Sequence, residues 1–208
     1  MVAVLSETDV IHPIMVEVEK IILGIDPGTL VMGFGLVQQK GKELSIIRMD
    51  VIKLNKLPNQ AMKLKMIFEK MLELVDEYHP DELAIEAPFF GKNVQSMLKL
   101  GRAQGVAMAA ALYRDIPIFE YAPRTIKQTI TGNGSASKEQ VSKMLQAMLH
   151  FGEMPKYFDA TDALAAAVCH YLDRGKDVNY TKPKHSRKSA SSQWVQFVQQ
   201  NPDRLSKP

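Results

Sequence analysis

The sequence predicts an α/β protein in which a five-stranded mixed sheet, with three antiparallel and two parallel strands, is flanked by helices. Two observations predict this fold class. First, three apolar segments of strand length follow one another between positions 20 and 54, separated only by turn residues. Second, short apolar segments alternate with segments of helical period farther along the chain, which is typical of parallel strands joined by helices.

The three leading segments are expected to form an antiparallel meander over 20–26, 31–37 and 44–54. Pro27-Gly28 ends the first segment with a turn, and the residues at 39–42 predict a hairpin turn before the third. Glycines within 31–37 permit another backbone to approach the second strand closely.

Helical spacing then begins at 59–78 and is ended by His79-Pro80. Gly101 and Gly105 in the next helix are spaced so that another element can pack closely against them. Residues 132–137, rich in glycine and serine, predict a flexible loop. The remaining elements expected along the chain are strands at 83–86 and 116–121 and helices at 94–113, 124–130, 138–149 and 159–172.

Composition narrows the class of protein. The 208 residues are 46% hydrophobic, enough for a core, and the single cysteine excludes an intramolecular disulfide. No apolar run approaches the ~20 residues of a membrane span, and the N-terminal residues read as neither signal nor anchor. We therefore expect a cytoplasmic protein, associated with the nucleoid if its partner is DNA.

Charge is unevenly distributed and suggests three parts: an N-terminal extension (1–20), a folded domain (21–173) and a basic, disordered tail (174–208). The tail carries eight Lys or Arg and two Asp, the first 20 residues carry four acids and one Lys, and the middle is neutral. Such a tail suits a polyanionic partner, and it equally suits a solvated segment that keeps the protein soluble.

Four carboxylates are placed where they can meet. Asp26 and Glu86 each end a predicted strand, and ligand sites in open sheets lie at the carboxyl ends of strands. Asp159 and Asp162 share one face of a predicted helix. Such a cluster is costly without cations, and its oxygen-only ligands suit two Mg²⁺ or Mn²⁺ ions that cleave a phosphodiester.

Each acid also has a structural explanation. Asp26 before Pro-Gly suits an ordinary turn residue, and Asp159 suits a helix N-cap with Asp162 in the first turn. Glu86 has the weakest structural explanation, because it follows a buried strand and a glutamate is rarely buried without a partner.

Five segments together resemble the RuvC Holliday junction resolvases of bacteria, over about residues 21–172: IILGIDPGT (21–29), LAIEAPFFGKN (83–93), LKLGRAQGVA (98–107), FEYAPRTIKQTITGNGSASKEQV (119–141) and DATDALAAAVCH (159–170). The resemblance implies an RNase H-like fold and a homodimer that requires Mg²⁺ or Mn²⁺. It also implies paired nicks in four-way junction DNA and cooperation with a branch-migration motor of the RuvA and RuvB type. Membranes and small-molecule substrates are not expected.

The resemblance also implies roles for individual residues. Asp26, Glu86, Asp159 and Asp162 fall on the family's catalytic acidic positions, the third of which is His in some relatives. Phe89 matches an aromatic that stacks in the junction centre, although Phe90 suits either role. Lys127 and Lys138 match basic positions near the scissile phosphate. Further backbone contacts are expected from Lys92, Lys99, Arg102 and Arg124.

Three other functions compete with this one. Phosphotransferases of the actin and sugar-kinase superfamily share the fold and a D-x-G-T motif, but they need about twice this length and a second D-x-G loop. A non-catalytic junction-binding protein would not need four acids. A related RNase H-like nuclease with another nucleic-acid substrate differs only in the segments around Phe89 and Lys138.

Overall fold

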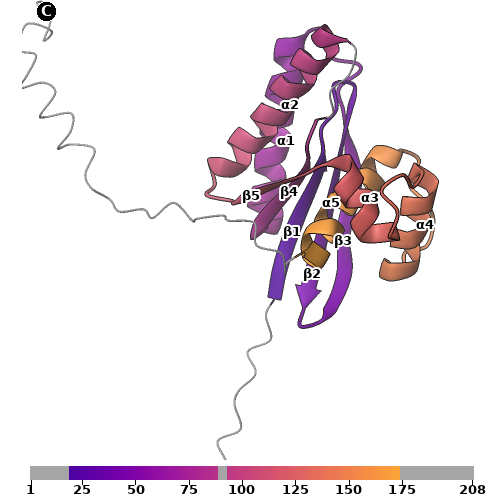
Figure 1. Cartoon of the computed structure of the whole chain (residues 1–208). Coiled ribbons are helices and arrows are strands. Elements are labelled where there is room, and N and C mark those ends of the chain that lie inside the picture. Colours follow the sequence, from indigo (N-terminus) through magenta and orange to yellow (C-terminus); the bar gives the residue numbers. More distant parts are fainter. Residues whose placement is uncertain (1–18, 89–92, 174–208) are drawn as a thin grey trace, which may run out of the picture. The chain divides into compact units, whose positions relative to one another are not determined.

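The computed structural model describes residues 19–88 and 93–173. Its five-stranded sheet has the order β3-β2-β1-β4-β5, in which β1 pairs antiparallel with β2 and parallel with β4 (Figure 1). The mixed sheet confirms the predicted fold class. The strands are β1 (Glu19–Asp26), β2 (Val31–Lys40), β3 (Glu43–Lys53), β4 (Glu82–Glu86) and β5 (Ile118–Tyr121). The helices are α1 (Gln60–Tyr78), α2 (Val94–Leu112), α3 (Pro123–Thr131), α4 (Lys138–Leu149) and α5 (Phe158–Asp173).

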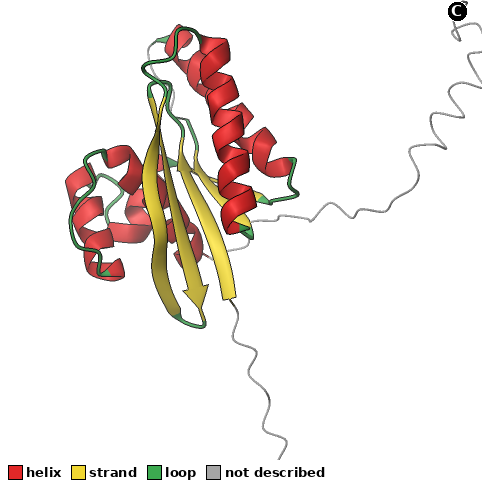
Figure 2. Cartoon of the chain, turned by 180° about the vertical axis from the view of Figure 1, so that it is seen from behind, coloured by secondary structure: helices red, strands yellow, loops and turns green. Residues whose placement is uncertain are grey.

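Helices cover both faces of the sheet, because alternate residues of each strand face opposite sides. Leu23 and Ile25 of β1 pack into the cluster that includes α1 and α2, whereas Ile22 packs into the cluster formed with α3, α4 and α5. Figures 1 and 2 show these two groups of helices on opposite sides of the strands. No helix in the described part of the chain is long and apolar enough to cross a membrane.

Helix α5 lies directly on the sheet because glycines remove the side chains that would hold it away. A Cβ added at Gly24 would lie 2.1 Å from the Ala163 carbonyl oxygen, and one at Gly33 would lie 1.8 Å from that of Asp159. This close approach agrees with the expectation for the glycines of the second strand. It brings the first turn of α5 against the strand that pairs with Asp26.

The predicted helix boundaries hold to within one residue, and capping at the helix ends explains why. The Asn59 and Asn93 side chains accept hydrogen bonds from the first turns of α1 and α2, as N-caps do, and His79 ends α1 in a left-handed conformation (φ 46°). The prediction for the fifth strand is too long. The observed strand begins at Ile118 and not at 116, because Pro117 has no N–H for strand pairing.

The segment 132–137 differs from the flexible loop that its composition predicts, because side chains tie it down. Gln128 donates to the Gly132 carbonyl oxygen (2.7 Å) and accepts from the Gly134 amide (3.0 Å). Ser137 then forms a capping box with Gln140 that starts α4. The segment therefore holds Lys138, the first residue of α4, in a defined position.

A polar network crosses the buried face beneath α5. The Tyr121 hydroxyl lies 2.6 Å from His170 Nδ1, and His170 Nε2 lies 2.7 Å from Glu82 Oε2. Lys20 forms an ion pair with the other oxygen of Glu82. Both ring nitrogens of His170 therefore have a hydrogen-bond partner, and the network links β1, β4 and β5 to α5.

Candidate active site

Asp26 and Glu86 end adjacent parallel strands on the face of the sheet that α5 covers. Ile22 of β1 pairs with Glu82 of β4, and the register continues through Ile25 and Ile85 to the two acids. Every second residue of a strand faces the same side of the sheet. Asp26 therefore shares the face of Gly24, against which α5 packs. The two carboxylates therefore emerge next to each other.

Helix α5 adds Asp159 and Asp162. The helix begins at Phe158, so Asp159 lies within its first turn; the N-cap interpretation of Asp159 is therefore wrong. The Asp159 backbone contacts Gly33, the residue that pairs with Asp26 across the β1–β2 ladder. Both α5 acids interact electrostatically with Asp26.

Two lysines face these acids from α3 and α4. Lys127 and Lys138 line the same hollow as Asp26, Glu86 and Asp162, and the Lys138 ammonium group forms an ion pair with the Asp162 carboxylate. The hollow has a volume of about 170 Å³. Its apolar wall consists of Pro123, Ile126, Val141 and Ala165.

The site carries more negative charge than its lysines neutralise. Burial, together with the charges of Glu86 and Asp162, raises the pKa of Asp26 to about 8. Burial and the charge of Asp162 raise the pKa of Glu86 to about 7. Burial also raises the pKa of Asp162, although the hydrogen bond from Lys138 opposes the change. The carboxylates gain free energy if a cation joins them.

The donor set fits hard divalent cations. Three of the four acids line the hollow, and Asp159 does not. Their carboxylates supply oxygen, which Mg²⁺ and Mn²⁺ prefer, and no imidazole or thiol lines the hollow. Within 19–88 and 93–173, no three acidic, imidazole or thiol groups are already in metal-ligating geometry. Asp162 is paired with Lys138, and the raised pKa values of Asp26 and Glu86 reflect burial and repulsion that a cation would relieve.

The other predicted contact residues that the structure describes do not line this hollow. Arg102 of α2 and Arg124 of α3 are exposed, as is Lys99. The aliphatic part of Arg124 covers Gly134, where an added Cβ would lie 2.8 Å from Arg124 Cγ. Phe89, Phe90 and Lys92 lie outside the described residues.

Sequence reasoning missed the apolar wall of the hollow. Ala165 follows Asp162 by three positions, so helical spacing alone places it on the same face. Ile126 and Val141 carry no comparable signal, because only the packing of α3 and α4 against α5 brings them to the acids.

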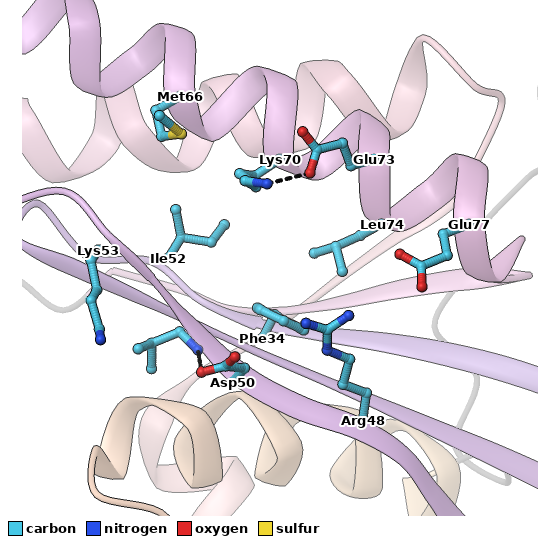
Figure 3. Close-up of a pocket in the computed structure, with 11 residues that line it drawn as sticks. Phe34, Arg48, Asp50, Ile52, Lys53, Met66, Lys70, Glu73, Leu74 and Glu77 are labelled. Atoms are coloured by element: carbon cyan, nitrogen blue, oxygen red, sulfur yellow. Dashed lines mark hydrogen bonds and ion pairs between the residues drawn. The ribbon is translucent and has the colours of Figure 1, made fainter.

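A larger hollow of about 380 Å³ lies between β3 and α1, and Figure 3 shows its lining. Its charged side chains balance: three are basic and three acidic, and Lys70 is already paired with Glu73. None of the four predicted catalytic acids lines it. Size alone therefore does not mark the chemical site in this protein.

Comparison with known proteins identifies the family of this chain. The family model described as crossover junction endodeoxyribonuclease RuvC matches residues 22–170. Among curated proteins, RuvC of Christiangramia forsetii is 59% identical, over 90% of this chain and 93% of its own length. RuvC of Bacteroides fragilis is 58% identical, over 90% of this chain and 96% of its own length.

Solved structures show the same fold. Thermus thermophilus RuvC in complex with a Holliday junction substrate superposes with a TM-score of 0.70 at 30% identity, covering 74% of this chain and 94% of that one. The yeast mitochondrial Holliday junction resolvase, at 15% identity and a TM-score of 0.52, shares the fold. The family match over 22–170 and the high identity over nearly the full length of these relatives mean that this chain belongs to the RuvC family of crossover junction endodeoxyribonucleases.

Proposed function

We propose that this chain is a structure-specific endonuclease that resolves Holliday junctions by paired symmetric nicks during homologous recombination and DNA repair. The observation that carries the proposal is the convergence of carboxylates from β1, β4 and α5 in one hollow with two lysines, in a chain of this family. The products are ends with a 5′-phosphate and a 3′-hydroxyl.

Asp26, Glu86, Asp159 and Asp162 are the proposed ligands of two Mg²⁺ ions, with Mn²⁺ as a substitute. Ions held by these four carboxylates would supply a lowered pKa for an attacking water and charge neutralisation at the leaving 3′ oxygen. The raised pKa values of Asp26 and Glu86 support this role, because unneutralised carboxylates of this kind recruit cations.

The remaining residues position the DNA. Lys127 and Lys138 bind oxygens of the scissile phosphate from the α3 and α4 side of the hollow, which the capping box at Ser137 supports by holding the start of α4. Phe89, or Phe90 beside it, stacks at the junction centre. Backbone phosphates are bound by Lys92, Lys99, Arg102 and Arg124.

The protein acts as a homodimer, because two active sites related by a twofold axis suit two cuts in a twofold junction. Helix α2 offers an interface. Its exposed side carries Val94 (68% exposed), Leu98 (51%) and Leu112 (53%), and no atom lies within 4 Å of a Cβ added at Gly101 or Gly105. A second copy of α2 can therefore approach this stripe closely.

Two further parts of the proposal concern context. The partners are four-way junction DNA and a branch-migration motor of the RuvA and RuvB type, in the cytoplasm at the nucleoid.

The basic tail (174–208), beyond the nuclease domain of 21–173, adds non-specific DNA affinity, so its removal should flatten the salt dependence of junction binding. An unchanged slope would exclude this role.

The test is a nicking assay with Mg²⁺ on a synthetic mobile four-way junction, comparing the wild type with Glu86→Gln. Glu43→Gln removes an exposed carboxylate from the opposite end of the sheet and serves as the matched control. We expect symmetric, ligatable nicks from the wild type and Glu43→Gln, and none from Glu86→Gln, which still binds the junction.

Other outcomes favour the alternatives. Tight junction binding without cutting by the wild type would indicate a non-catalytic junction-binding protein. Equal cutting of a linear duplex would indicate an RNase H-like nuclease without junction specificity.

A further inference from the structure

Lys53, Lys156 and Tyr157 form a small cation–aromatic cluster outside the hollow that holds the acids. The Tyr157 ring centroid lies 5.5 Å from Lys53 Nζ and 5.9 Å from Lys156 Nζ. The cluster joins the end of β3 to the loop that enters α5. None of its three residues lines the hollow of Asp26 and Glu86.

The cluster lies on the same face of the sheet as the acids. Ile52 packs into the cluster of α1 and α2, so the next residue, Lys53, faces the side covered by α5. Figure 3 shows the Lys53 side chain directed away from α1, opposite to Ile52. Tyr157 directly precedes α5, the helix that carries Asp159 and Asp162.

The sheet register places this cluster within a few nucleotides of the reaction. Asp26 pairs with Gly33 of β2; Val31, two residues nearer the start of β2, pairs with Lys53 of β3. With strands ~4.8 Å apart and a rise of ~3.3 Å per residue, the Cα atoms of Asp26 and Lys53 are separated by on the order of 12 Å.

The lysines are available for an anionic partner. Both are exposed, and neither ammonium group has a carboxylate partner among residues 19–88 and 93–173. Apolar surface adjoins the cluster, since Phe158 is 42% exposed. Tyr157 itself is half-buried. Ammonium groups without a carboxylate partner beside a partly exposed aromatic ring are the combination that single-stranded nucleic acid binds, through phosphate contacts and stacking.

We propose that this cluster, Lys53, Lys156 and Tyr157, binds the DNA strand next to the cleaved phosphodiester. Lys53 and Lys156 bind phosphates that flank one nucleotide, and the Tyr157 ring packs against its base. The inference rests on the proposed junction-cleaving function and extends the contact surface from the hollow to the β3 edge of the sheet. It adds a contact to those proposed for the basic residues of α2, α3 and α4.

The first experiment measures junction binding by fluorescence anisotropy in EDTA, with the full-length protein, as a function of salt concentration. The double variant Lys53→Gln/Lys156→Gln should lower the slope of log affinity against log salt by about 1.5 to 2. The matched control, Lys40→Gln/Lys42→Gln, removes the same charge at the opposite end of the β2–β3 hairpin and should leave the slope unchanged.

The second experiment isolates the ring. Tyr157→Leu should weaken junction binding about fivefold or more, the loss expected for one base stacked on an aromatic ring, whereas Tyr157→Phe should bind within about twofold of the wild type. A merely structural role of Tyr157 predicts equal affinity for all three proteins once their thermal unfolding shows that they are folded.

The third experiment places the contact on the DNA. Methylphosphonate at single positions within about four nucleotides of the cut neutralises one phosphate at a time. At one or two positions it should weaken binding of the wild type but not of Lys53→Gln/Lys156→Gln.

The outcomes separate the two proposals. If the wild type cuts junctions and the cluster variants match it in slope, affinity and response to methylphosphonate, the DNA contact is wrong and the proposed function stands. If the wild type neither binds nor cuts junctions, the proposed function fails, and the contact proposal fails with it.

Discussion

At the scale of single residues, the carboxylates of the hollow work against folding whenever no cation neutralises them. Burial and the neighbouring acids hold the pKa of Asp26 near 8, so the folded state disfavours its charged form at neutral pH. This is a cost in stability that the protein keeps for its chemistry, as active sites commonly do.

Asp26→Asn should therefore stabilise the metal-free protein while abolishing cleavage. We expect the free energy of unfolding at pH 7 in EDTA to rise by roughly 1 kcal/mol, because Asn has no carboxyl that is ionised in the unfolded chain and must be protonated in the folded one. Added Mg²⁺ should stabilise the wild type and leave the variant nearly unchanged. Urea unfolding measures both effects, with Glu43→Gln as control. A variant less stable than the wild type in EDTA would contradict the electrostatic interpretation.

The pKa of Glu82 is shifted in the opposite direction from that of Asp26. Burial raises its pKa, but hydrogen bonds from His170 and Lys20 outweigh burial and lower the pKa to about 2. A carboxylate whose folded pKa is depressed stabilises the fold above its unfolded pKa, near 4.5, and loses this contribution as pH falls toward 2.

Glu82→Gln should consequently lose stability at neutral pH. The loss should be no more than about 3 kcal/mol at pH 7, since the side chain is largely buried, and it should shrink steadily between pH 4.5 and the lowest pH at which the protein stays folded. Chemical unfolding at pH 7, 4 and 3 measures the difference. A difference that does not vary with pH would mean that packing, and not charge, explains the effect.

At the scale of elements, the contact between α5 and the sheet decides whether the site exists. Gly33 allows the Asp159 backbone to lie against β2, and Gly24 does the same for Ala163 against β1. Any side chain at these positions pushes the helix, and with it two acids, away from Asp26 and Glu86.

Gly33→Ala should therefore reduce both stability and cleavage, because the added Cβ overlaps backbone that cannot rotate away. We expect a loss of about 1 to 3 kcal/mol and a fall in the nicking rate of tenfold or more. Gly152→Ala is the matched control, because a Cβ there meets nothing within 4 Å. Equal behaviour of the two variants in thermal unfolding and nicking would show that α5 tolerates displacement.

At the scale of the whole molecule, the proposed paired cutting requires a second copy of the chain. The exposed stripe of α2 combines large apolar side chains with Gly101 and Gly105, and burying such a stripe is favourable.

Leu98→Glu should then yield a monomer in sedimentation experiments, because two carboxylates would face each other across the twofold axis. The monomer should produce single, uncoordinated nicks in place of paired ones. Met62→Glu changes a similarly exposed apolar residue of α1 and should remain dimeric. A Leu98→Glu protein that stays dimeric would place the interface elsewhere.

The order and type of the elements, and the position of Asp26 and Glu86 at strand ends, follow from the sequence alone. Hydrophobic period and turn residues are local signals, so they place helices and strands to within three residues; the largest error is at β2, which is predicted to end at 37 and ends at Lys40. Helical spacing adds the acids of α5 as candidates, and the family segments add the two lysines. Local signals fail where a side chain from another element holds a segment in place. The Gln128 side chain does this by hydrogen bonding to the backbone of 132–137, the segment predicted to be flexible.

Only the tertiary structure shows that Lys138 is paired with Asp162, that Ile126 and Val141 line the hollow, and that Tyr157 lies between Lys53 and Lys156. These contacts join elements that are distant along the chain, and their formation depends on how closely α5 approaches the sheet. The distance between α5 and the sheet depends on how well one face of the helix fits the glycines of β1 and β2. The spacing of residues within a single segment does not encode this fit.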